Sequence, residues 1–306
     1  MSEQPPGAVA YQLRRVRRHL QWGRAEGWGR LVEEDRLDPR ERVRLAAAKW
    51  RWRRRHGVPR GTAVPVYVVG LQRSGTNMLT RGLDGAPEVE VRGENDRTVF
   101  HRFRLRGDDV LVRTVRRSRH RLVLVKPLCD SQHVDRLLDL PEIPGGRALW
   151  AFREPHARAR SEVARFGAAN LRALQAIAVG DTAGRWQAER LDDVAVETVR
   201  RLRPERLTPY EGALAFWAVR NGLWFDLGLD AREDCLLVDY DAVVADPAPA
   251  AERLCAFLGL PARSDLLGHV VPRSTHHDDH PEVDPDVRAL TDSTWERLRA
   301  AAGTAP

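Results

Sequence analysis

The chain has 306 residues and a mass of 34.6 kDa, which is enough for one large α/β domain with a small appendage. Hydrophobic residues make up 42% and charged residues 30%, which excludes a disordered chain, and no apolar run approaches the roughly 20 residues of a membrane span. The net charge of +7 and the isoelectric point near 10.0 favour an anionic partner. Three widely spaced cysteines and the lack of an apolar leader predict a cytoplasmic protein without a disulfide framework or a cleaved signal peptide.

The first 60 residues are the most basic stretch of the chain. Apolar residues recur at helical spacing between arginines over residues 9–20, which predicts a first basic helix. Asp38 suits the N-cap of a second helix, Glu41 completes a capping box, and Gly57 ends that helix. We therefore expect an Arg-rich helical N-terminal extension over residues 1–60, whose charge suits peripheral contact with a membrane surface. No motif that reads a specific nucleic-acid sequence occurs.

From residue 61 onward, short apolar segments alternate with helical patterns. Such segments are typical of parallel strands that are buried on both faces. The strand candidates are residues 65–70, 122–125, 148–152 and 236–240, and the helix candidates lie near 75–85, 131–140, 155–178, 209–229, 247–258 and 292–301. This alternation predicts one α/β domain over residues 61–306, a P-loop-like three-layer fold with a central parallel sheet. The charged segment 180–208 has no strand pattern and is interpreted as a helical insertion.

The strongest local motif is a strand followed by a tight loop and a helix. Such a junction points backbone N–H groups and the helix dipole at an anion, usually a nucleotide phosphate. Gly70 and Gly75 have the spacing of the nucleoside-triphosphate loop. Thr76 and Asn77, however, stand where that loop has its lysine and its magnesium-binding hydroxyl. The cation of this loop is Arg73, so the sequence predicts a phosphate site that does not need a metal-bound triphosphate.

The loop sequence Gly-Leu-Gln-Arg-Ser-Gly-Thr-Asn, residues 70–77, resembles the 5′-phosphosulfate loop of sulfotransferases whose donor is 3′-phosphoadenosine 5′-phosphosulfate (PAPS). Its Arg-Ser-Gly-Thr form is most similar to the tyrosylprotein sulfotransferases and their bacterial relatives. The resemblance implies PAPS as the donor and no metal. It assigns donor contacts to the loop residues Arg73, Ser74, Gly75, Thr76 and Asn77.

A second strand, turn and helix over residues 148–165 predicts a second anion site. Arg153 ends the strand at the sheet edge where ligands of open α/β sheets bind. Ser161 and Arg165 follow four residues apart, on one helix face, which suits a terminal phosphate. In the family that the loop resembles, an arginine and a serine at the spacing of Arg153 and Ser161 hold the 3′-phosphate. Arg165 matches a further arginine of the tyrosylprotein branch.

Two later segments extend the resemblance, which covers about residues 64–280. The strand and turn that end at Tyr240 are similar to a segment through which the family contacts its nucleotide. The resemblance implies that contact for Tyr240, and the alternative is a core tyrosine at a strand end. Ser274 lies in a short Arg-Ser-Thr sequence that resembles a nucleotide-contacting tail segment.

Sulfuryl transfer needs cations for the sulfonate oxygens and for the leaving phosphate. Lys126 follows the apolar strand 122–125 and so lies at the same sheet edge as the loop. Its compact charge suits a transient oxyanion, and the family has a lysine at the matching place. Arg73 and the loop N–H groups suit the leaving group. Lys126 and Arg73 are therefore predicted to be catalytic.

The reaction also needs a base for the acceptor hydroxyl, and Glu94 is the first candidate. It follows Gly93 at the end of a short strand, and a carboxylate near cations stays ionised, as a base must. The tyrosylprotein branch has its catalytic glutamate just after a glycine in this region, although the alignment slips by one residue here. Asp96, His101 and His133 therefore stay open as alternatives.

Contiguous histidines and aspartates over residues 276–280 invite interpretation as a metal site. Contiguous side chains point in different directions, and no helical i, i+4 pair with a third ligand accompanies them. We interpret the segment as a polar loop and expect no metal.

The sequence thus predicts a sulfotransferase that transfers a sulfuryl group from PAPS to a hydroxyl acceptor by in-line displacement. The acceptor class stays open among glycans, lipids, metabolites and peptides, because acceptor pockets come from variable loops. One alternative is a P-loop kinase-like phosphotransferase, which the missing Gly-Lys-Ser/Thr sequence disfavours. The other is a non-catalytic nucleotide-binding module, which the presence of Glu94 and Lys126 disfavours.

Overall fold

The computed structural model describes residues 39–271 and 280–304. The chain divides into two compact units, Met1–Arg55 and His56–Pro306. The described residues of the first unit belong to helix α3 (Pro39–His56), which ends just before Gly57, where the sequence predicts the end of its second helix.

Several sequence predictions fall outside the described residues and stay predictions. They are the helix over residues 9–20, the N-cap Asp38, the donor contact of Ser274 and the polar loop over residues 276–279.

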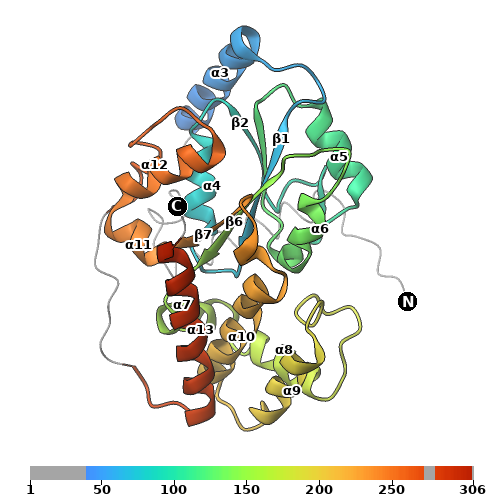
Figure 1. Cartoon of the computed structure of the whole chain (residues 1–306), viewed down its shortest axis with the longest axis vertical. Helices are drawn as coiled ribbons and strands as arrows, with labels where there is room; N and C mark the ends of the chain where they lie inside the picture. The colour runs from blue at the N-terminus through green and yellow to red at the C-terminus, as the bar shows by residue number, and fades with distance from the viewer. Residues whose placement is uncertain (1–38, 272–279, 305–306) are drawn as a thin grey trace. The chain divides into compact units, whose positions relative to one another are not determined.

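A five-stranded parallel sheet forms the centre of the second unit (Figure 1). In spatial order its strands are β2 (Val89–Arg92), β5 (Leu122–Val125), β1 (Val64–Gly70), β6 (Arg147–Phe152) and β7 (Cys235–Asp239). Each neighbouring pair is parallel. The four strand candidates are confirmed to within one residue at either end.

Helices follow most of the strands along the chain. They are α4 (Thr76–Asp84), α5 (Asp108–Arg117), α6 (Val134–Leu138), α7 (Pro155–Phe166), α8 (Ala169–Ala178), α9 (Asp193–Arg201), α10 (Pro209–Asp226), α11 (Tyr240–Ala245), α12 (Pro247–Leu258) and α13 (Pro285–Thr304). Two short 3-10 helices, η1 (Leu128–His133) and η2 (Leu229–Ala231), complete the set of described helices.

The side chains of β1 alternate between two separate cores, because successive residues of a strand point to opposite faces of the sheet. Tyr67 and Val69 pack into one core, and Val66 and Val68 pack into the other. Helices α5, α6, α7, α8, α10 and α13 contribute to the first core, and α4, α11 and α12 cover the opposite face (Figure 1). The chain therefore has a three-layer α/β fold, as its sequence predicts.

Three details differ from the sequence predictions. The expected single helix over residues 155–178 is two helices, α7 and α8, which separate at Gly167 with a φ of 58°. Helix α5 and an antiparallel hairpin of β3 (Phe100–His101) and β4 (Arg104–Leu105) lie between β2 and β5, where no such elements were predicted. Tyr240 begins α11 instead of ending the preceding strand.

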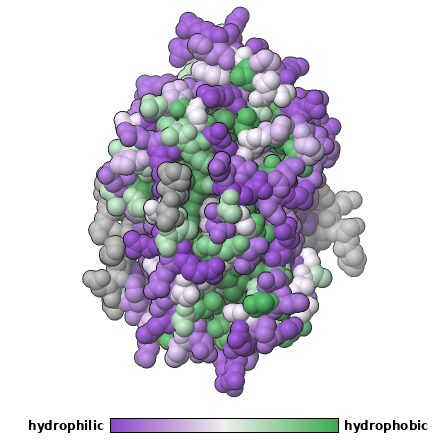
Figure 2. All heavy atoms as spheres, viewed as in Figure 1, coloured by the Kyte–Doolittle hydropathy of each residue, from purple (hydrophilic) through white to green (hydrophobic). Residues whose placement is uncertain are grey.

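Hydrophilic side chains make up most of the surface seen in Figure 2, with smaller apolar areas between them. Among the described helices, none combines the length and the apolar character that a membrane span requires.

Candidate active site

The carboxyl ends of all five parallel strands carry residues that the sequence singled out. They are Gly70 at the end of β1, Glu94 just beyond β2, Lys126 after β5, Arg153 after β6 and Tyr240 after β7. Because the carboxyl ends of parallel strands meet at one edge of the sheet, these residues gather there.

Two glycines shape the loop between β1 and α4. Gly70 has a φ of 112°, and a Cβ atom there would lie 2.3 Å from the carbonyl oxygen of Ala151 on β6. Gly75 has a φ of 88°, and a Cβ atom there would lie 2.3 Å from the ring of Tyr240. Since neither position has room for a side chain, the loop backbone can lie close to its neighbours and to an anion.

Between these glycines the loop carries a cation and a buried hydroxyl. Arg73 has a φ of 70°, a left-handed conformation that costs a non-glycine residue on the order of 1–3 kcal/mol. The side chain of Ser74 is fully buried, and its Oγ atom has no hydrogen-bond partner among the described residues. Thr76, also buried, begins α4. A strained cation and an unsatisfied hydroxyl at the start of a helix fit a bound phosphate.

The two predicted anion sites meet in the structure. The Nε atom of Arg73 donates a hydrogen bond of 2.8 Å to the Oγ atom of Ser161 on α7. Arg165 lies one turn further along α7 and is half-buried. The guanidinium of Arg153 lies 4.7 Å from the ring centre of Tyr240, which itself contacts the loop at Gly75. The loop after β1, helix α7 and the turn after β6 therefore come together at one part of the sheet edge.

Lys126 connects the loop to the candidate base. Its side chain is 8% exposed, and its Nζ atom lies 3.2 Å from Oε2 of Glu94 and donates a hydrogen bond of 2.5 Å to Oδ1 of Asn77. The Glu94 side chain is 18% exposed. The residues after β2 and β5 and the first turn of α4 thus bring a carboxylate, an ammonium and an amide into contact.

Asp96, an alternative base, is occupied by structural contacts. Its Oδ2 atom accepts a hydrogen bond of 2.9 Å from Arg92, and its Oδ1 atom accepts from the backbone and the hydroxyl of Thr98. Burial opposes the ionisation of Asp96, but the hydrogen bonds from Thr98 and Arg92 keep its pKa below the usual value. Its lone pairs are therefore largely used in holding the turn after β2.

The two alternative histidines are also placed differently from Glu94. His101 is exposed on β3. The Nε2 atom of His133 lies 3.0 Å from Oε2 of Glu189. Among the four candidate bases, Glu94 is the one that the structure places in an ion pair with Lys126.

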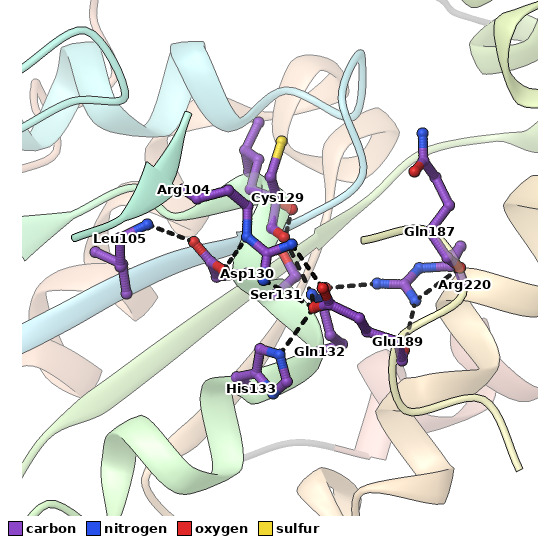
Figure 3. A network of polar contacts seen from close by, with 11 residues as sticks. Arg104, Leu105, Cys129, Asp130, Ser131, Gln132, His133, Gln187, Glu189 and Arg220 are labelled. Atoms are coloured by element: carbon purple, nitrogen blue, oxygen red, sulfur yellow. Dashed lines mark hydrogen bonds and ion pairs between the residues drawn. The ribbon is translucent and has the colours of Figure 1, made fainter. Parts of the chain in front are cut away.

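A polar network that the sequence did not predict lies at the same sheet edge (Figure 3). Arg104 on β4 donates from Nε to Asp130 over 2.5 Å and binds Glu189 through both Nη atoms, over 2.9 and 2.8 Å. Glu189 belongs to the insertion 180–208, and Asp130 belongs to η1. The network therefore ties the insertion and the hairpin to the segment that follows β5.

Glu189 is the acceptor at the centre of this network. It also accepts hydrogen bonds of 2.7 Å from Gln132 and 3.0 Å from His133. Burial opposes its ionisation, but the hydrogen bonds from Arg104, Gln132 and His133 lower its pKa to about 2. Glu189 is consequently a carboxylate at neutral pH.

Arg220, from the middle of α10, contacts the same network. Its side chain is buried, donates 2.7 Å to Oε1 of Gln132, and reaches the carbonyl oxygens of Gln187 and Glu189. Burial lowers its pKa to about 10. Burial and the charge of Glu94 in turn raise the pKa of Cys129 to about 12, so this thiol next to the network is uncharged.

One group of potential metal ligands occurs among the described residues, at the start of α7. Glu154, His156 and His280 each place a ligand atom within 4.8 Å of the others. The Nδ1 atom of His156, however, lies 2.7 Å from the hydroxyl of Tyr210, and Nδ1 of His280 lies 3.2 Å from a guanidinium nitrogen of Arg160. These contacts use one ring nitrogen of each histidine, and the nearby guanidinium of Arg160 repels a cation.

No protein-family model matches the chain, and the curated proteins contain no match. Among solved structures, a sulfotransferase from Alicyclobacillus acidocaldarius aligns at 20% identity and a TM-score of 0.42, over 80% of this chain and 96% of that one. The sulfotransferase domain of the curacin biosynthetic pathway aligns at 13% identity and a TM-score of 0.43, over 76% and 98% of the two chains. The sulfotransferase domain of the Synechococcus PCC 7002 olefin synthase aligns at 17% identity and a TM-score of 0.39, over 82% and 96%. All three of these solved structures are described as sulfotransferases or sulfotransferase domains.

Proposed function

We propose that the chain is a sulfotransferase that moves a sulfuryl group from PAPS to a hydroxyl acceptor. The observation that most supports this function is the ion pair of Glu94 and Lys126 beside the loop that follows β1. A carboxylate there is a base for the acceptor hydroxyl, and the ammonium suits the charge that develops on the transferred sulfonate. A site that only binds nucleotide would not require this pair.

The two anion sites give the donor its proposed orientation. We assign its 5′-phosphosulfate to the loop, where an anion would satisfy the Ser74 hydroxyl and neutralise Arg73. We assign its 3′-phosphate to Arg153, Ser161 and Arg165, on the turn and helix after β6. The remaining proposed donor contacts are Gly75, Thr76, Asn77 and Tyr240.

Residues of the chain supply the groups that an in-line transfer needs. Glu94 accepts the proton of the acceptor hydroxyl as the acceptor oxygen attacks sulfur. The bond between sulfur and the 5′-phosphate oxygen breaks, and 3′-phosphoadenosine 5′-phosphate (PAP) leaves with the bonding electrons. Lys126 stabilises the sulfonate oxygens, and Arg73 with the loop N–H groups neutralises the leaving phosphate. Asn77 holds the ammonium of Lys126 in place.

Nucleotide binding is the first test. PAP at 100 times its dissociation constant should stabilise the protein by about 2.7 kcal/mol, with or without a chelator, because arginines replace the magnesium-binding groups of a triphosphate loop. Thermal-shift and calorimetric titrations measure this effect. Binding that requires magnesium would favour the kinase-like alternative.

Transfer itself is the second test. Purified protein, PAPS labelled with ³⁵S and fractionated extracts or defined glycans, lipids, metabolites and peptides should yield a labelled product and PAP. The product identifies the acceptor class. Tight PAP binding with no acceptor-dependent consumption of PAPS would favour the non-catalytic module. Contact of residues 1–60 with a membrane surface stays a separate prediction.

A further inference from the structure

A fully buried arginine lies directly behind the donor loop. Arg158 on α7 has no solvent exposure, and its Nε atom donates a hydrogen bond of 3.2 Å to the carbonyl oxygen of Gln72 in the loop. Its Nη1 atom donates to Glu162 and, over 3.2 Å, to the carbonyl oxygen of Ala213 on α10. Its Nη2 atom has no hydrogen-bond partner among the described residues. Burying a cation with an unsatisfied N–H group costs free energy of folding, and this cost indicates a specific role for Arg158 at this position.

The buried pair of Arg158 and Glu162 is oriented with its positive member toward the loop. Glu162 lies one turn further along α7 and is only 1% exposed. The loop carbonyl of Gln72 contacts Arg158. Burial lowers the pKa of Arg158 to about 10, which still leaves it charged at neutral pH. The pair therefore acts on the loop as a dipole whose positive end is the nearer one.

A second cation, Arg73, belongs to the loop itself. Arg73 is close enough to Arg158 for its charge to oppose ionisation of the buried guanidinium. The guanidinium of Arg73 donates a hydrogen bond to Ser161 on α7. In sequence, Ser161 lies between Arg158 and Glu162. Two like charges around one short loop repel each other, and a bound anion would relieve that repulsion. Little solvent surrounds the buried charge, so it is screened weakly.

We propose that Arg158 is a positioning residue for the donor: it holds the Gln72 carbonyl of the loop and adds positive potential that strengthens binding of the 5′-phosphosulfate. This inference rests on the proposed sulfotransferase function. Because Arg158 is fully buried, it would act on the donor through the loop and not by direct contact. Glu162 moderates the effect by offsetting part of the charge.

The test is calorimetric titration of PAP into the full-length protein at low ionic strength, with two opposite substitutions. Arg158→Met keeps much of the side-chain volume and removes the charge, and it should raise the dissociation constant of PAP by about tenfold. Glu162→Gln leaves the arginine charge uncompensated, and it should lower the dissociation constant by about threefold or more. Arg158→Lys keeps the positive charge but lacks the planar guanidinium group. Its dissociation constant for PAP should lie between those of Arg158→Met and wild type.

Arg220→Met is the matched control. Arg220 is likewise a fully buried arginine whose pKa burial lowers to about 10, but it donates its hydrogen bonds to Gln132, Gln187 and Glu189. It should reduce stability in urea without changing PAP affinity.

The outcomes separate the two hypotheses. An affinity of Arg158→Met within twofold of wild type, like that of the control, would make Arg158 purely structural and overturn the inference. If Glu162→Gln does not fold, the contrast between Arg158→Met, Arg158→Lys and Arg220→Met decides. A wild-type protein that binds no PAP would instead overturn the proposed function, and with it the inference.

Discussion

The two halves of the candidate site are held together in different ways. The proposed donor half consists of the loop over residues 70–77 and the start of α7. Its shape comes mainly from the backbone conformation of the loop, which packs against Ala151 and Tyr240 without room for a Cβ atom. The network half consists of the β3–β4 hairpin, η1 and the insertion 180–208. Its shape comes from side chains, above all Arg104 and Glu189, which are 85 residues apart.

This difference has a functional consequence. The backbone of the loop over residues 70–77 tolerates few changes, since Gly70 and Gly75 have no room for a Cβ atom. The network half depends on ion pairs between the hairpin, η1 and the insertion. Changes in the sequences of those segments can alter it without altering the backbone of the loop over residues 70–77. A constant donor half and an exchangeable network half would suit an enzyme family that keeps one donor and changes acceptors.

The largest effect is expected at Glu94, where the two halves meet. Glu94→Gln preserves the shape of the side chain and removes the proton acceptor, so the turnover rate should fall by about 10² to 10⁴. PAP affinity should be unchanged, because no phosphate contact is lost. Single-turnover kinetics with PAPS and the identified acceptor measure the rate. Retention of more than about a tenth of the wild-type rate would assign the base to another group.

A smaller effect is expected within the donor half, at Arg153. Arg153→Ala removes a charge-assisted contact with the proposed 3′-phosphate, which is worth about 1.5–3 kcal/mol, or roughly tenfold to a hundredfold in affinity. The contact exists before and during the reaction, so the KM for PAPS should rise more than kcat falls. Initial-rate kinetics and PAP titration measure the two quantities. A turnover defect with normal PAP affinity would place Arg153 outside the 3′-phosphate site.

The sequence predicts the strands and the loop of the proposed donor half well, because these elements follow local rules. Apolar runs give the strands, and the glycine spacing gives the loop after β1. Since carboxyl ends of parallel strands share one edge, Lys126 and Glu94 could be expected near the loop, and the structure brings them together. Their catalytic roles remain proposals.

The network half follows no local rule, so the sequence does not predict it. Arg220 interrupts an apolar helix pattern, which is a signal of a buried functional or structural charge, but the pattern does not name its partners. In the sequence, nothing distinguishes Glu189 from the other charged residues of the insertion 180–208. Gly167 similarly gave too weak a signal to separate α7 from α8. Contacts between distant segments depend on the packed structure, so they appear only there.

Glu189→Gln tests whether the network half is a frame apart from the donor half. Loss of its charged hydrogen bonds should lower the free energy of unfolding at pH 7 by about 1–2 kcal/mol, a value reduced for the partial exposure of the side chain. PAP affinity should stay within twofold of wild type. Urea denaturation and PAP titration measure both. A large loss of PAP affinity would show that the two halves are not independent.

The pH dependence of stability sharpens the same test. The pKa of Glu189 is lowered to about 2 in the folded protein, below its usual value of about 4.3. Its contribution to stability is therefore complete above about pH 4.3 and is lost as the pH falls toward 2. The difference in unfolding free energy between wild type and Glu189→Gln should shrink over that window. A difference that does not change from pH 7 to pH 3 would contradict an ionised Glu189 in the network.

The smallest effect is expected at Asp96, two residues from the proposed base. Its carboxylate holds Arg92 and Thr98, and hydrogen bonds from both lower its pKa against the opposing effect of burial. Asp96→Asn keeps acceptor capacity for Thr98 and weakens the contact with Arg92, so turnover should fall by less than about threefold, in contrast to the loss of 10² or more at Glu94. Single-turnover rates of the two variants, measured side by side, separate a catalytic carboxylate from a structural one on the same turn. If Asp96→Asn proved the more damaging change, the base would be Asp96, and the ion pair of Glu94 with Lys126 would serve to position the lysine.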